Sequence, residues 1–333
     1  MEMRRTSPGV LVIAVAASLL YLLLPTPALD AMQRGAQQAN PFSGKRLYVD
    51  PNSPAKRQAE TWRRSRPADA ALMDQIARRP TARWFGDWVT NVGREVNQAV
   101  TTITGAGALP VFVAYRIPAR DCGSFSAGGA RNADAYRKWI GDFGKGLAGR
   151  QAVVILEPDA LAGMDCLPAA KQAERTMLIR EAVSALKAQR AAVYIDAGHA
   201  RWHSPSRMAP RLRDAGIADA AGFALNVSNF QDTRQNIVYG EQLSRLVGGK
   251  HFVIDTSRNG APTRDAEWCN PAGRALGVAP TVNTGHPLVD AFLWVKVPGE
   301  SDGTCRGGPR AGAWWSEYAL ELARLAARLS GVA

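Results

Sequence analysis

The stretch VVILEPDALAG, residues 153–163, decides how the fold is read. Four apolar residues run without interruption into Glu157, Pro158 and Asp159, and small apolar residues follow. A strand that is apolar on both faces is typical of a parallel sheet that helices cover on both sides. Two carboxyl groups directly after such a strand place acidic chemistry at its carboxyl end.

Apolar runs of strand length recur along the chain and are separated by segments with helical periodicity, such as 132–148 and 173–189. This alternation predicts a single-domain α/β fold, either a parallel β/α barrel or a doubly wound sheet. No GxGxxG or GxxxxGK sequence follows a strand, which removes the usual reason to favour a nucleotide-binding sheet. The seven expected strands are 82–86, 109–116, 152–158, 191–198, 222–228, 251–257 and 291–298.

The first 31 residues differ from the rest of the chain. Two arginines precede an uncharged run from Val10 to Leu24, and proline and small residues follow. This run is shorter than the roughly 20 apolar residues that span a bilayer, so it favours a cleaved signal peptide over an N-terminal membrane anchor. After a polar lead over 32–40, one domain extends over 41–333. We expect a secreted protein that contacts the membrane only if its first segment stays uncleaved.

Four cysteines, an even number, fit an exported protein and predict two disulfides. Of the three possible pairings, Cys122 with Cys166 and Cys269 with Cys305 closes the shortest loops. Each of these bonds would connect neighbouring loops of the fold.

The net charge of +12 is spread over single Arg and Lys residues on helix-like segments. The chain has no arginine block and no basic-aromatic motif, which are the patterns that indicate nucleic-acid binding. We therefore expect a solvated cationic surface and no nucleic-acid partner.

Polar residues follow the expected strands. The carboxyl ends of the strands of a parallel barrel meet on one face, where such folds keep their active sites. A single Asp, Asn or Ser at such a place can also cap a helix or make a turn, but repetition at five strand ends favours a site. Carboxylates with Lys, His and Trp are the composition of a site that protonates and hydrates a sugar bond. These residues are Trp84, Tyr115, Asp121, Asp159, Asp196, His199, Asn229, Asp255, Lys296, Glu300 and Asp302.

Two of these segments carry a resemblance to a known family. VAYRIPARDCGSFSAGG (113–129) and VVILEPDALA (153–162) resemble the two signature motifs of glycoside hydrolase family 6, which contains β-1,4-glucan-cleaving endoglucanases and cellobiohydrolases. The resemblance implies a distorted, TIM-barrel-like fold with seven parallel strands, which agrees with the independent strand count. It spans essentially the whole domain and continues through 194–202, 226–230, 253–260, 268–277 and 294–305.

The resemblance implies hydrolysis with inversion of the anomeric configuration. Asp159 matches the general acid that protonates the leaving oxygen, and Asp121 matches the second aspartate, which raises the pKa of that acid. Asp302 matches the aspartate proposed as the base, while a water relay that ends at Asp121 is the rival assignment. Asp196 matches a supporting carboxylate of the site.

The resemblance also implies how substrate is bound. Tyr115 matches the tyrosine that crowds the distorted sugar ring, and Ser126 lies in the segment that contributes a water-positioning serine. Neutral glucan offers no charge, so ring stacking on tryptophan must supply most of the binding, and neither a metal nor a cofactor is needed. The implied platforms and hydrogen-bonding partners are Trp84, Trp202, Trp268, His199, Asn229, Lys296 and Glu300.

One departure from the family and one short segment bear on how the enzyme acts. Gly86, in WFGDW, stands where fungal cellobiohydrolases carry an acidic residue, so binding at the outermost donor subsite is expected to differ. The resemblance also implies that cellobiohydrolases of the family roof the cleft with long insertions, one of them between the last two cysteines. The short segment between Cys269 and Cys305 therefore favours an open-cleft endoglucanase over an exo-acting cellobiohydrolase. Six tryptophans have no matched role and are expected to pack in the core or on the surface: Trp62, Trp88, Trp139, Trp294, Trp314 and Trp315.

Two functions of other classes compete with this interpretation. A metal-dependent hydrolase would also gather Asp and His, and 196–203 offers one carboxylate and two imidazoles, but no HxH or HExxH sequence occurs. A barrel that binds glycan without turnover is the second alternative. The preferred hypothesis is a monomeric cellulase that acts on cellulose or a related β-glucan.

Overall fold

The computed structural model describes residues 40–263 and 267–331, and residues 39–333 form one compact unit. The expected signal segment, 1–31, lies outside the described residues. Among the described helices, none is both long and apolar enough to cross a membrane.

The strands form one curved parallel sheet whose spatial order is the order of the sequence. A doubly wound sheet reverses its strand order, so the sequential order confirms the barrel. In the described part of the chain, no ladder of backbone hydrogen bonds pairs the first strand with the last. Instead, Ala82 N donates to Trp294 O at 3.0 Å, and Trp84 Nε1 donates to Val295 O at 2.8 Å. The strands are β1 (Arg83–Gly86), β2 (Val111–Tyr115), β3 (Ala152–Leu156), β4 (Ala191–Asp196), β5 (Gly222–Leu225), β6 (His251–Asp255) and β7 (Val289–Leu293).

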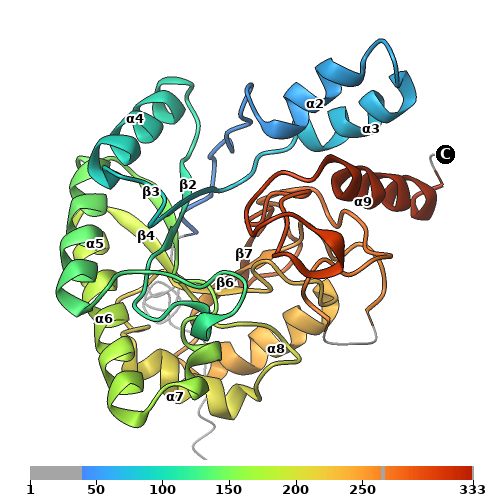
Figure 1. Ribbon diagram of the computed structural model, residues 1–333. Coiled ribbons are helices and arrows are strands. Elements are labelled where there is room, and N and C mark those ends of the chain that lie inside the picture. Colours follow the sequence, from blue (N-terminus) through green and yellow to red (C-terminus); the bar gives the residue numbers. More distant parts are fainter. Residues whose placement is uncertain (1–39, 264–266, 332–333) are drawn as a thin grey trace, which may run out of the picture. The chain divides into compact units, whose positions relative to one another are not determined.

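Helices cover the outer surface of the sheet in chain order (Figure 1). Their apolar faces and the outward side chains of the strands form the largest buried cluster of the domain. Several of these helices begin after an Asn, Ser or Asp residue whose side chain accepts a backbone N–H of the first turn. Asn132, for example, accepts from Ala135 N at 2.9 Å. The covering helices are α4 (Val92–Gly105), α5 (Ala133–Leu147), α6 (Ala169–Ala188), α7 (Pro205–Asp214) and α8 (Thr233–Leu246).

Three helices form a separate layer with its own apolar cluster. They are α2 (Pro54–Trp62), α3 (Pro67–Ala77) and α9 (Ser316–Leu329). Both α2 and α3 carry proline in their first turn, where the missing N–H costs nothing.

The last strand begins and ends earlier than 291–298, so that expectation was wrong in its bounds. Asp290 breaks the apolar pattern within β7, but its carboxylate accepts from Tyr194 Oη at 2.6 Å and lies 2.9 Å from His251 Nδ1, inside the barrel. Residues 294–298 belong to the loop beyond the strand, although most of them are apolar. There the backbone N–H of Lys296 donates to the Asp255 carboxylate at 2.9 Å instead of to a neighbouring strand.

Both expected disulfides are present, which confirms the pairing. The Cys122–Cys166 bond connects two short 3-10 turns, η1 (Asp121–Gly123) and η2 (Ala162–Cys166). The Cys269–Cys305 bond connects the loop after β6 to the turn η3 (Cys305–Gly307). Both bonds therefore restrain loops at the carboxyl ends of the strands.

Candidate active site

A cleft of about 1210 Å³ takes in the carboxyl ends of the strands and extends to residues of α3 and α4. It collects every expected site residue except Asp196 and Asp255, both of which are buried. The residues that the sequence spreads over seven strand ends thus converge on one surface, as parallel barrels require. They are Trp84, Tyr115, Asp121, Ser126, Asp159, His199, Trp202, Asn229, Trp268, Lys296, Glu300 and Asp302.

Asp159 follows β3 in a turn that places two non-glycine residues in the left-handed region, with φ of 49° at Glu157 and 66° at Asp159. Such backbone conformations cost about 1–3 kcal/mol each and cluster at functional sites. The turn is held because Asp159 N donates to Asp196 Oδ1 at 2.9 Å. It directs Asp159 into the cleft at a fixed position.

The pKa of Asp159 is raised to about 7, first by burial and then by the negative charges of Asp121 and Asp302. The buried Oδ1 of Asp159 has no hydrogen-bond donor in the described part of the chain, so nothing at that oxygen offsets desolvation. A carboxyl group with this pKa retains its proton in near-neutral water and can donate it to a substrate.

Glu157 has a different role from its neighbour. Its carboxylate is buried and accepts the backbone N–H groups of Arg116, at 3.0 and 2.9 Å, and of Ile117, at 2.9 Å. Burial raises the pKa of Glu157 to about 7, although these N–H donors oppose the shift. The side chain joins the ends of β2 and β3 and does not line the cleft.

Asp196, at the end of β4, lies beneath the acid. Its Oδ1 accepts from Asp159 N at 2.9 Å and from Gly198 N at 3.0 Å. Burial and the charge of Asp159 raise the pKa of Asp196 well above its usual range. The residue therefore positions the Asp159 turn without facing the cleft.

Asp121 lies in the loop after β2 and has a left-handed backbone, φ 54°. Its Oδ2 accepts from Ser126 N at 2.7 Å, and burial raises its pKa. Arg120 organises this loop, because it donates to Asp87 Oδ1, Tyr115 O and Ser126 O, each at 2.8 Å. Arg120 was not predicted as a site residue, although it directly precedes Asp121 in the motif at 113–129.

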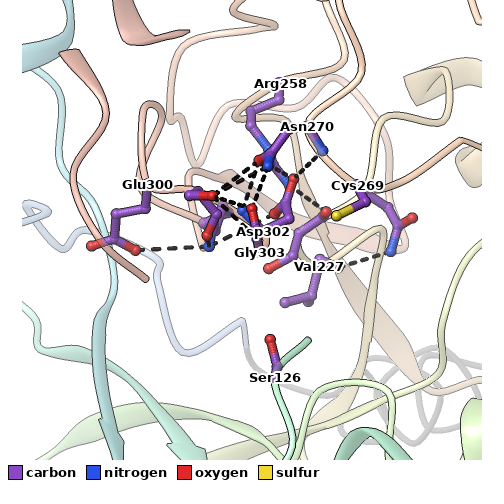
Figure 2. Close-up of polar contacts among 12 residues, drawn as sticks. Ser126, Val227, Arg258, Cys269, Asn270, Glu300, Asp302 and Gly303 are labelled. Atoms are coloured by element: carbon purple, nitrogen blue, oxygen red, sulfur yellow. Dashed lines mark hydrogen bonds and ion pairs between the residues drawn. The ribbon is translucent and has the colours of Figure 1, made fainter. Parts of the chain in front are cut away.

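Asp302 belongs to a dense polar group (Figure 2). Its Oδ2 accepts from Arg258 Nη1 at 2.9 Å and from Asn270 N at 3.1 Å, and Lys296 Nζ lies 3.8 Å from its Oδ1. Ser126 lies opposite this group and shares no drawn contact with it. Arg258 is fully buried and was not predicted as a site residue, although it stands three residues after β6 in the matched segment 253–260.

Asp255, which also follows the strand-end pattern, has a structural role. Its carboxylate accepts the backbone N–H groups of Ser228, Ser257 and Lys296 at 2.9 to 3.0 Å. It therefore joins the loops after β5, β6 and β7, and so orients the Lys296 loop toward Asp302.

The walls of the cleft carry the expected aromatic side chains. Trp202 and Trp268 remain 37% and 41% exposed, and Trp84 packs edge-on against Tyr115 with ring centroids 5.2 Å apart. The ring of His199 lies 5.5 Å from that of Trp202. Burial, followed by the nearby cationic groups, lowers the pKa of His199 to about 4, so the imidazole is neutral at pH 7.

Some polar side chains that border the cleft also form contacts within the protein. Lys296 Nζ donates to Ser301 O at 3.3 Å and lies 3.9 Å from Glu300 Oε2. Asn229 donates to Val227 O at 3.1 Å. All three expected partners, Lys296, Glu300 and Asn229, border the cleft.

Trp88 departs from its expected packing role. It is 57% exposed and lines the cleft. For the other five unmatched tryptophans the expectation was correct: Trp62, Trp139 and Trp294 are buried, and Trp314 and Trp315 are half-buried.

The metal alternative finds no support in the geometry of 196–203. Asp196 Oδ1 is occupied by two backbone N–H groups, and His203 Nε2 lies 2.8 Å from Ala162 O. Over residues 40–263 and 267–331, no cluster of three or more His, Cys, Asp or Glu side chains could hold a metal ion.

Comparisons with known proteins agree with this geometry. The model of the family Glycosyl hydrolases family 6 matches residues 42–326. Endoglucanase A of Cellulomonas fimi is 47% identical over 288 residues, which cover 85% of this chain and 62% of that protein. The chain thus spans less than two thirds of this relative. Endoglucanase 1 of Streptomyces halstedii is 39% identical over 319 residues, which cover 92% of this chain and 97% of that protein.

A solved structure extends the match to three dimensions. The endoglucanase Cel6 of Mycobacterium tuberculosis aligns with a TM-score of 0.82 and 48% identity, over 86% of this chain and 99% of that one. Sequence, family model and fold agree over the domain that builds the cleft, and this chain therefore belongs to glycosyl hydrolase family 6.

Proposed function

We propose that this protein hydrolyses internal β-1,4-glucosidic bonds in cellulose or a related β-glucan, with inversion of the anomeric configuration. The observation that carries the proposal is the buried Asp159 carboxyl, whose pKa is raised to about 7 at the edge of a tryptophan-lined cleft. The relatives named endoglucanases support the substrate class. The Mycobacterium tuberculosis enzyme was solved with a thio-linked cello-oligosaccharide.

Asp159 acts as the general acid. It donates its proton to the leaving glycosidic oxygen while positive charge develops on the sugar ring. Asp121 raises the pKa of Asp159 before the reaction and, as an anion, stabilises the positively charged ring during it. Tyr115 lies in the wall between Trp84 and the Asp121 loop, where it restricts the shape of the ring at the cleavage point.

The attacking water delivers its proton through a relay that ends at Asp121. Asp302 is the less suitable acceptor, because a proton on it would deprive the buried Arg258 guanidinium of its counter-charge. In the described part of the chain Asp121 receives one backbone N–H, and it lies close to Ser126, which positions the water. An inverting enzyme needs room for that water. The acid and base carboxyl groups of inverting glycosidases therefore stand roughly 6.5–9.5 Å apart.

Substrate binding rests on stacking and on hydrogen-bonding groups. Trp84, Trp202 and Trp268 present ring faces to glucose units, and His199, Asn229, Lys296 and Glu300 set the register of the chain. We propose that one chain suffices, as a monomer, because all of these residues come from the same cleft. The two disulfides and the signal-like first segment support action outside the cytoplasm.

The decisive experiment measures two quantities on carboxymethyl-cellulose, reducing ends and viscosity. An endo-acting hydrolase lowers viscosity steeply for few new reducing ends, whereas an exo-acting enzyme does not. The α-anomer must appear first in NMR spectra of cello-oligosaccharide products, and Asp159→Asn must abolish turnover while retaining binding. Absence of new reducing ends would show a glycan-binding barrel, and initial β-anomer would refute inversion.

A further inference from the structure

Trp88 is an exposed aromatic side chain that folding does not explain. It lies two residues beyond β1, is 57% exposed and borders the same cleft as Trp84. Exposed aromatic surface inside a concave site marks a place where a ligand is bound.

The ring of Trp88 is held in place by its neighbours. A Cβ atom added to Gly86 would lie 2.3 Å from Cζ3 of Trp88 and 2.5 Å from its Cη2, so only glycine leaves room for the indole here. This explains the glycine at the position where the sequence departs from the fungal enzymes. One side of the ring is thus supported by backbone while more than half of the residue stays open.

A second support comes from the Asp121 loop. The guanidinium of Arg120 lies 5.7 Å from the centroid of the Trp88 ring and 4.4 Å from that of Tyr115. Arg120 is itself fixed by Asp87, whose other oxygen accepts from Gly129 N at 3.2 Å. Trp88, Arg120, Tyr115 and Trp84 therefore form a continuous row along one wall.

We propose that Trp88 is an additional sugar platform on the donor side, which binds a glucose unit beyond the one stacked on Trp84. The inference rests on the proposed glucan hydrolysis and assigns a further subsite to it. The resemblance assigns the position of Gly86 to the outermost donor subsite, and Trp84 and Trp88 flank this glycine in the sequence, so both are assigned to the donor side. A rigid, pre-positioned indole binds a sugar face without an ordering cost of its own.

The register of cleavage tests the assignment. With cellopentaose labelled at its reducing end, we expect the wild type to cut at two positions, which leave three or two glucose units on the donor side. Trp88→Ala should lower the three-unit cut about tenfold relative to the two-unit cut. Gly86→Ala, which displaces the indole, should reproduce that shift. Trp88→Phe, which keeps an aromatic ring, should stay close to the wild-type ratio of the two cuts.

The control is Met177→Ala, on the exposed outer face of α6 and outside the cleft, which should leave the ratio unchanged. An equal loss of both cuts in Trp88→Ala would show a merely structural role and overturn the proposal. An unchanged ratio, or a shift toward the three-unit cut, would overturn it as well. If the wild type cleaved no cello-oligosaccharide at all, the proposed hydrolysis would fail instead, so the two failures are distinguishable.

Discussion

The ring of Phe125 lies 5.9 Å from the ring of Trp268, so the loop that carries Asp121 contacts the opposite wall of the cleft. Phe125 also packs on Gly303, where an added Cβ would lie 2.5 Å from Phe125 Cβ. The contact closes the loop against Trp268 and Gly303, although Phe125 remains 47% exposed.

Phe125→Ala should therefore weaken loop closure and lower kcat on cello-oligosaccharides by about ten- to a hundredfold, because Asp121 and Ser126 flank the contact and depend on its position. Amide hydrogen exchange over 121–128 should increase in the same variant. Phe125→Tyr should retain activity, and Leu329→Ala, at the exposed end of α9, serves as the control. Unchanged kcat with faster exchange would show that closure does not limit turnover.

The pH dependence of kcat/KM should fall on the alkaline side near pH 7, because Asp159 must be protonated and its pKa is about 7. The charge of Asp121 is one cause of that pKa, so Asp121→Asn should move the alkaline limb of the residual activity to lower pH. A pH profile of wild type and variant on one soluble substrate checks this. A limb that stays in place would mean that Asp121 does not act on the pKa of Asp159.

Asp159 should also cost the protein stability at high pH. Its pKa is about 7 in the folded state, against 3.8 for an unperturbed aspartate, so the folded state binds more protons between these values. Its contribution is fully favourable below pH 3.8 and is lost as pH rises through 7. Asp159→Asn should accordingly raise Tm by a few degrees at about pH 8 and change it little at about pH 3.5, as thermal unfolding at both pH values would show. An equal shift at both would contradict the assignment.

Much of this arrangement could be predicted from the sequence. Uninterrupted apolar runs such as 153–156 identify buried parallel strands, and the polar residues after them converge because the strand ends do. The bounds of β7 were missed because the pairing of Asp290 with His251 and Tyr194 depends on three distant strands. Periodicity does not report such pairs.

The supporting residues of the site were harder to find for the same reason. Arg258 and Asn270 read as ordinary polar residues after β6, and only the folded chain brings them to Asp302. Likewise Trp88 resembled a packing residue, since nothing in the local sequence shows that Gly86 leaves its ring open to the cleft. Spatial neighbours far apart in the chain decide these roles.

The ion pair between Arg258 and Asp302 should be strongly coupled. Arg258→Met leaves the buried Asp302 without its main cation and should lower the free energy of unfolding by about 3–5 kcal/mol. Adding Asp302→Asn should recover a large part of that loss, because no uncompensated charge remains. Urea unfolding of both variants measures the difference. A double variant as unstable as the single one would indicate that packing of the guanidinium, rather than its charge, dominates.

Azide should separate the two candidate acceptors of the water proton. The Asp121→Ala variant lacks the terminal acceptor of the relay and has space beside Ser126 for a small anion. Azide can attack the sugar carbon there without giving up a proton. It should therefore restore measurable turnover and form an α-glycosyl azide. Asp302→Ala should gain nothing, because its loss exposes the Arg258 cation, which binds azide away from the reacting carbon. Product analysis by mass spectrometry and NMR distinguishes the cases. Rescue of Asp302→Ala alone would identify Asp302 as the base, because the vacated carboxylate would then be the group that azide replaces.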